Sequence, residues 1–95
     1  MHIPVLLQEV IKFSNPQPNE NFIDATVGEG GYTMAILQHT LPNGKVLGID
    51  LDAESLKIAQ KNLAAFKNRV ILKHGNYKDI DVIVKEANFF PINGI

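Results

Sequence analysis

The chain contains no cysteine. Disulfides, thiol nucleophiles, zinc ribbons and thiolate-bound iron–sulfur clusters are therefore excluded within it, and we expect a cytoplasmic location. No apolar run approaches the ~18 residues of a membrane helix, and no basic-then-apolar leader opens the sequence, so no membrane partner is expected. The formal net charge is only -1, which excludes a strongly basic tail for binding nucleic acid.

What is present is the composition of one small globular domain, here residues 1–95, with 45% hydrophobic and 20% charged residues. Helical and strand-like periodicities alternate along the chain. The pattern predicts helices and strands in this order: helix Val5–Phe13, strand Asn21–Thr26, helix Thr33–Leu41, strand Val46–Asp50, a helix with a buried stripe at Leu56, Ala59, Leu63 and Phe66, strand Val70–Lys73, helix Ile80–Glu86 and the start of a strand at Ile92–Ile95.

This alternation predicts an α/β fold with a doubly wound parallel sheet. The run Val46–Asp50 is nearly all apolar, which is typical of a strand covered on both faces. Asp52 is expected to cap the following helix, and Asp79 the helix after that. Because Ile92–Ile95 begins an element at the end of the chain, we expect the N-terminal half of such a sheet, truncated at its fourth strand.

A glycine-rich stretch follows the first predicted strand. Gly28, Gly30 and Gly31 stand between that strand and a helix, where bare backbone and helix N–H groups can approach a ligand. Asp50 ends the second strand, 22 positions after Gly28, where a carboxylate can accept hydrogen bonds from a ribose diol. The two features together predict a site for an adenosine-containing cofactor, and a side chain at Gly30 is expected to block its approach.

Two cofactors fit this pattern, and a ligand-free turn is the third interpretation. The dinucleotide pattern G-x-G-x-x-G is only half matched, since Thr33 occupies its last glycine position. Asp24, four residues before Gly28, adds negative charge that would repel a pyrophosphate and suit an ammonium and a sulfonium. The charges thus favour S-adenosylmethionine over NAD. Asp24 is itself a candidate ligand.

Three blocks of the sequence resemble one family. The opening His2-Ile3-Pro4-Val5-Leu6-Leu7-Gln8-Glu9-Val10, the motif Asp24-x-Thr26-x-Gly28-x-Gly30-Gly31 and the run Gly48-Ile49-Asp50-Leu51-Asp52 are similar to those of the bacterial 16S ribosomal RNA cytosine-N4 methyltransferases, the MraW or RsmH type. One position departs from the pattern: Tyr32 stands where the family usually has histidine.

The resemblance implies a Rossmann-like class I methyltransferase fold with S-adenosylmethionine as methyl donor. By position, Gly30, Gly31 and Tyr32 would contact the methionine part of the donor, and Asp50 the ribose. Tyr77 would lie beside the adenine, where an aromatic ring can stack on a base.

The resemblance also implies a substrate, 16S ribosomal RNA or the small ribosomal subunit. The residues themselves predict no metal site. The family's aspartate-leucine-glycine block and inserted RNA-binding region are not within these residues, so we expect the donor-binding half of an enzyme, with little activity alone. No catalytic residue is assigned. The alternatives are a fragment of an NAD-dependent dehydrogenase and a non-catalytic binding module.

Other polar residues carry weaker signals. His2 lies in the opening motif, near the predicted site or at an ordinary exposed terminus. His39 and His74 lack metal-ligand spacing. A modest basic region is formed by Lys57, Lys61, Lys67, Arg69 and Lys73. Its simplest interpretation is a solvated helix face, and the alternative is a contact with RNA.

Overall fold

The computed structural model describes residues 11, 12 and 14–95. The predicted helix Val5–Phe13 and His2 therefore fall largely or wholly outside the described residues. Three parallel strands form a sheet in the order β1-β2-β3: β1 (Phe22–Asp24), β2 (Val46–Asp50) and β3 (Val70–His74). The helical elements are α2 (Gly31–His39), α3 (Ala53–Asn62), the short 3-10 helices η1 (Ala64–Phe66) and η2 (Tyr77–Asp79), and α4 (Ile80–Ala87).

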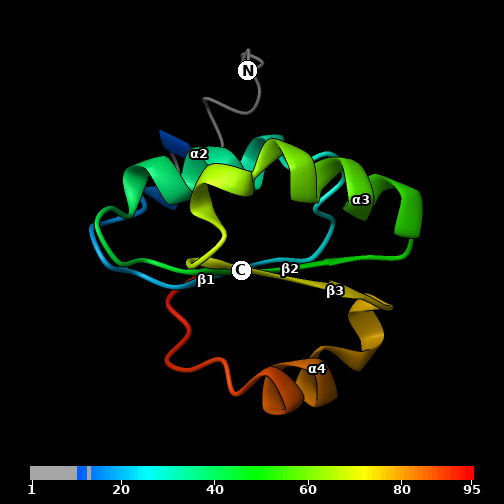
Figure 1. Ribbon diagram of the computed structural model, residues 1–95. Helices are drawn as coiled ribbons and strands as arrows, with labels where there is room; N and C mark the ends of the chain where they lie inside the picture. The colour runs from blue at the N-terminus through cyan, green and yellow to red at the C-terminus, as the bar shows by residue number, and fades with distance from the viewer. Residues whose placement is uncertain (1–10, 13) are drawn as a thin grey trace.

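The helices cover the sheet in two layers. Figure 1 shows α2 and α3 on one side of the strands and α4, with the C-terminal segment, on the other. Along β2, Val46 belongs to the core under α2 and α3, whereas Leu47 and Ile49 belong to the core against α4, and all three side chains are fully buried. The predicted two-sided strand is therefore confirmed, and with it the α/β class.

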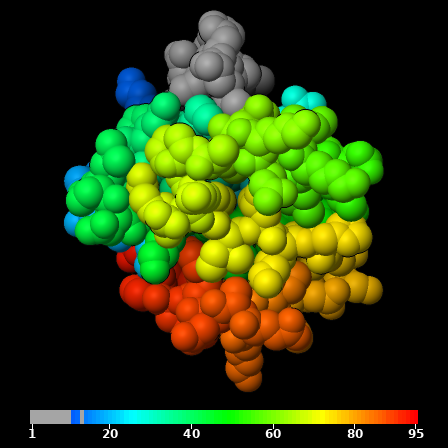
Figure 2. Space-filling model, in the orientation of Figure 1, coloured from blue at the N-terminus to red at the C-terminus, as the bar shows by residue number. Residues whose placement is uncertain are grey.

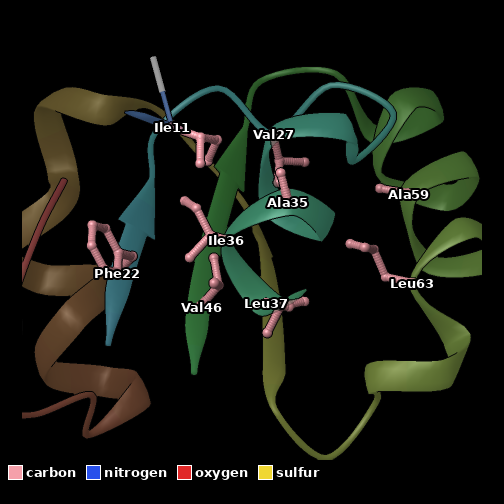
Figure 3. Packing of buried hydrophobic residues seen from close by; sticks show 9 residues of the cluster. All are labelled: Ile11, Phe22, Val27, Ala35, Ile36, Leu37, Val46, Ala59 and Leu63. Atoms are coloured by element: carbon pink, nitrogen blue, oxygen red, sulfur yellow. The ribbon is translucent and has the colours of Figure 1, made fainter. Parts of the chain in front are cut away.

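The larger core lies between the sheet and the layer of α2 and α3. Ile36 of α2 occupies the centre of this cluster beside Val46, while Ala59 and Leu63 reach it from the α3 side (Figure 3). The smaller core receives Val84 of α4 and Phe89. Phe89 thus packs beneath the sheet, whereas its neighbour Phe90 is 61% exposed.

Several boundaries differ from the prediction. β1 is confined to Phe22–Asp24, because the chain bends at Ala25 into the glycine loop. α2 begins two residues before Thr33, at Gly31, since Gly30 takes the capping position, and it ends at His39 with Thr40 as C-cap.

The predicted helix caps have different outcomes. Asp52 caps α3 through bonds that its side chain accepts from the backbone N–H groups of Glu54 and Ser55, as predicted. Asp79 stands at the N-cap of α4 without a side-chain capping bond, so that prediction is wrong. The side chain of Asn76 instead accepts from the N–H of Lys78 in the preceding turn.

The C-terminal segment returns to the free side of β1. Gly94 forms an isolated parallel bridge with Phe22, and its carbonyl accepts a hydrogen bond of 2.9 Å from the N–H of Ile23. The predicted strand Ile92–Ile95 is thus a single bridge here. The chain crosses from β1 to β2 and β3 over one face and comes back over the other, so the strand order reverses beside β1. Open α/β sheets bind their ligands at the carboxyl ends of the strands at such a reversal.

Candidate cofactor site

The glycine loop connects the carboxyl end of β1 to α2. Gly28 and Gly30 have positive φ angles of 53° and 99°, in the left-handed region that glycine adopts without steric cost. The N–H of Gly30 donates to the carbonyl of Val27 (2.9 Å), and Gly30 in turn accepts from Met34 (2.8 Å). The loop therefore ends in the first turn of α2, and no acidic residue lies in that turn.

The two positive-φ glycines face different surroundings. A β-carbon at Gly30 would lie 3.2 Å from the side chain of Leu63, whereas one at Gly28 would have no neighbour within 4 Å. A side chain at Gly30 would thus be directed against the protein's own core. The expectation that a side chain at Gly30 would block the ligand directly therefore needs correction. Such a side chain would act through strain in the loop, whereas a side chain at Gly28 would enter open space.

Asp50 joins the tip of β2 to the loop. Its Oδ2 accepts a hydrogen bond of 2.8 Å from the N–H of Gly28, and its Oδ1 accepts one of 2.9 Å from the N–H of Asp52. Each carboxylate oxygen has a second acceptor site, so Asp50 can also accept from two further hydroxyl groups. The side chain is partly exposed, and its position is fixed before any ligand arrives.

Asp24, at the tip of β1, is enclosed. It is 5% exposed, its Oδ2 accepts a bond of 2.6 Å from the hydroxyl of Thr33, and its Oδ1 accepts from the N–H of Thr26 (3.2 Å). Burial raises the pKa of this carboxyl above its ordinary value, and the charge of Asp50 adds to the rise, against the lowering effect of its two hydrogen bonds. In this arrangement Asp24 ties the start of the loop to the first turn of α2. Direct contact of Asp24 with a ligand stays a prediction.

The two predicted aromatic residues lie on opposite faces of the sheet. Tyr32 is half-buried against the core under α2, and its hydroxyl lies 3.5 Å from that of Ser14. Tyr77 is 52% exposed in η2, just beyond β3, and lines a hollow with Ile23 and Ile80 on the α4 face. Hydrogen bonds thus tie Asp24, Gly28, Gly30 and Asp50 into one unit, and the side chains of Tyr32 and Tyr77 are not among its described hydrogen bonds.

Contacts that local sequence patterns did not predict support the loop from behind. The amide of Asn62, at the end of α3, donates to the carbonyl of Glu29 (2.9 Å), and Leu63 packs against Gly30. Gly48 is also structural, because a β-carbon there would lie 2.6 Å from Val27 of the loop. None of these contacts has a local signal, although a glycine inside an otherwise apolar strand does indicate a close approach of another segment.

The chemistry of this unit fits S-adenosylmethionine. Two carboxylates at adjacent strand tips favour a cationic ligand.

Among the described residues, no group of three or more histidine, aspartate or glutamate side chains is placed to hold a metal ion. Over the same part of the chain, no helix is both long and apolar enough to cross a membrane.

Comparison with solved structures identifies the fold. A SAM-dependent O-methyltransferase from Thermotoga maritima superimposes with a TM-score of 0.73 at 21% identity, over 83% of this chain and 31% of that one. TrmN from Thermus thermophilus gives a TM-score of 0.72 at 21% identity, over 93% and 25%. The fold is therefore that of the S-adenosylmethionine-dependent methyltransferases.

Sequence comparison then identifies the family. The MraW methylase family matches residues 1–95. A ribosomal RNA small subunit methyltransferase H from Thermotoga neapolitana is 44% identical over 94 residues, and one from Syntrophotalea carbinolica is 43% identical over 94 residues. The chain belongs to the MraW methylase family, which is a family of enzymes, and S-adenosylmethionine is the cofactor that this family and this fold imply.

The match covers 99% of this chain but only 31% and 30% of those two relatives. The chain thus spans about a third of their length. The comparisons confirm the resemblance that the three sequence blocks indicated, and they decide between methyltransferase and dehydrogenase in favour of the former.

Proposed function

We propose that this chain binds S-adenosylmethionine as the donor-binding part of an enzyme that methylates N4 of a cytosine in 16S ribosomal RNA. The observation that carries the proposal is the bond from the N–H of Gly28 to Asp50, which joins the glycine loop to the acid at the next strand tip, where the strand order reverses. The names of the relatives, which are methyltransferases of the small-subunit ribosomal RNA, support the substrate. Methylation would take place in the cytoplasm, on this RNA or on the small subunit.

The site residues have separate roles in the proposal. Asp50 would accept from the ribose hydroxyls with its remaining lone pairs, and Gly30 and Gly31 would offer backbone to the methionine part of the donor. Tyr32 would contact the same part, although its hydroxyl faces Ser14 in this structure. Tyr77 would place its ring beside the adenine.

The chemistry requires positioning more than covalent participation by the protein. S-adenosylmethionine supplies a methyl group activated by its sulfonium. The N4 amine of cytosine attacks that methyl carbon, the carbon–sulfur bond breaks, and one proton leaves the nitrogen. The chain's own contribution is to hold the donor rigidly, through a loop that is bonded to Asp24, Asp50 and Asn62 before binding. Among the described residues we assign none to removing the proton.

Calorimetric titration of the chain tests donor binding. S-adenosylhomocysteine should bind, and NADH should not compete with it. Asp50→Ala should weaken binding, whereas Glu86→Ala, which removes an exposed acid from α4, should not. Binding of NADH, or no binding of S-adenosylhomocysteine, would contradict the proposal.

The reaction itself is tested with small-subunit RNA. We expect little methyl transfer to deproteinised RNA or assembled subunits by the 95-residue chain alone. A chain extended to the full length of these relatives should modify cytosine N4. Methylation of another atom by that longer chain would overturn the cytosine assignment, and binding without turnover would favour the binding-module alternative.

A further inference from the structure

Charge is divided unevenly along the chain. Residues 53–75, from α3 through β3, contain five lysine or arginine residues and one acid, Glu54. The remainder contains four basic and nine acidic residues, so the net charges are +4 and -5, which sum to the -1 of the whole chain. In Figure 2 the residues of this basic segment, green to yellow, occupy the middle of the visible face above α4 in orange.

A groove lies within this basic segment, between α3 and β3. Its volume is about 420 Å³, and its apolar lining includes Leu63, Val70 and Leu72. Lys57, Lys67 and His74 supply polar groups along the same groove. Lys57 also lies 3.4 Å from Glu54, the single acid of the segment, and both of these side chains are largely exposed.

The position of the groove links it to the cofactor site. β3 is an outer strand of the described sheet, so the groove is at a sheet edge. His74 pairs with Asp50 in the β2–β3 register, and its Nε2 donates to the carbonyl of Leu51 (2.8 Å). One end of the groove therefore adjoins the strand tip that carries Asp50, and the other extends to Val70 and Lys67 at the opposite end of β3.

We propose that this groove, lined by Lys57, Lys67 and His74, is an accessory contact for the backbone of the substrate RNA, outside the cofactor site. Lysine ammonium groups bind phosphates as point charges, and an apolar floor accepts the less polar faces of sugars and bases. An RNA strand that lies in the groove is directed toward the carboxyl ends of the strands, where the methyl donor is expected. This inference rests on the proposed function and extends it to a second surface.

The test compares two double variants with the same change in charge. Lys57→Glu/Lys67→Glu alters the groove, whereas Lys78→Glu/Lys85→Glu alters exposed lysines in η2 and α4. The probe is a fluorescently labelled single-stranded fragment of small-subunit ribosomal RNA, titrated with the chain at several salt concentrations. Calorimetry with S-adenosylhomocysteine, on every variant, checks that the cofactor site is intact.

For a single strand, each lost phosphate contact lowers the slope of log affinity against log salt concentration by about 0.7. We therefore expect the groove variant, which loses two contacts, to bind the RNA roughly 25-fold more weakly at about 0.1 M salt. The control pair should change the affinity much less and leave the slope unaltered. If the reversed charges disturb folding, the milder variant Lys57→Gln/Lys67→Gln takes the place of the first. It also removes both positive charges, so it should give the same reduction in slope.

Equal weakening by the groove and control pairs would overturn the proposal, since it would indicate only a general effect of net charge. Binding of polyglutamate with the same dependence on the two lysines would also overturn it, because the groove would then accept any polyanion. S-adenosylhomocysteine could fail to bind the unmodified chain while the RNA contact still depends on the two lysines. That result would contradict the proposed function but not the proposed RNA contact in the groove.

Discussion

The tips of β1 and β2 each end in an aspartate, yet the two carboxylates have different surroundings. Asp24 is buried, and both of its oxygens accept bonds from Thr26 and Thr33 within the loop and α2. Asp50 is partly exposed and holds the loop at Gly28 with one oxygen while retaining lone pairs toward solvent. The same residue type therefore builds the loop from one strand and is available to a ligand from the other.

This difference follows from register as well as from burial. Asp24 pairs with Gly48, two residues before the end of β2, so Asp50 extends farther along the sheet than Asp24 does. The loop then passes beside β2, where the N–H of Val27 donates to the carbonyl of Ile49 (3.1 Å). The shorter strand is covered by its own loop, and the longer one is not.

The largest effect is expected at the loop that joins the two tips. Gly30→Val should lower the free energy of unfolding by about 3 kcal/mol, because it places a branched side chain at a positive φ and against Leu63. Gly28→Ala, also at positive φ but without a neighbour, should cost only about 1 kcal/mol. Urea denaturation measures both. Equal losses at the two glycines would contradict the assigned role of Leu63.

The next effect concerns the exposed tip. Asp50→Ala should weaken binding of S-adenosylhomocysteine by about 100-fold, because it removes charged acceptors for two ribose hydroxyls and the anchor of Gly28. Calorimetry gives the dissociation constants. An unchanged constant would mean that the acid at the tip of β2 only holds the loop and does not contact the ligand.

At the buried tip the expected effect is on stability. Thr33→Val keeps the shape of the side chain but leaves Asp24 without its hydrogen bond of 2.6 Å. It should lower the free energy of unfolding by about 2 kcal/mol. Ser14→Ala, which removes an exposed hydroxyl, should have little effect. A loss of cofactor affinity without a loss of stability would contradict the structural role of Asp24.

Asp24 also predicts a dependence on pH. Its pKa is raised in the folded protein, so its contribution to stability is fully present below pH 3.8 and is lost as the pH rises through the folded pKa. Asp24→Asn does not titrate, so the Tm of the variant minus that of the unmodified chain should increase as the pH rises above 3.8. A difference that decreases over this range would mean that the carboxylate is stabilised rather than penalised in the fold.

The smallest effect is expected behind the loop. Asn62→Ala removes one exposed hydrogen bond to Glu29, worth about 0.5–1 kcal/mol, so the dissociation constant for S-adenosylhomocysteine should increase by about two- to fivefold. Lys61→Ala, on the same helix, serves as the control. Equal changes in the two variants would indicate that α3 does not support the loop through this bond.

Much of the fold could be predicted because its signals are local. The apolar run of β2, the Asp52 cap and the glycines after β1 depend on residues within a few positions of one another, and the structure confirms each of them. The predictions that were wrong lie at element ends, such as β1 beyond Asp24 and the side chain of Asp79, where packing competes with local preference.

By itself, the sequence determined the class of fold, the place of the glycine loop and the presence of an acid at the tips of β1 and β2. Only the tertiary structure decided which acid is enclosed, which glycine faces open space, and that Asn62 and Leu63 support the loop. The reason is distance along the chain: Gly28 and Asp50 are 22 positions apart, and Glu29 and Asn62 are 33. Short-range preferences do not act over such separations, whereas close packing and the pairing of buried polar groups do.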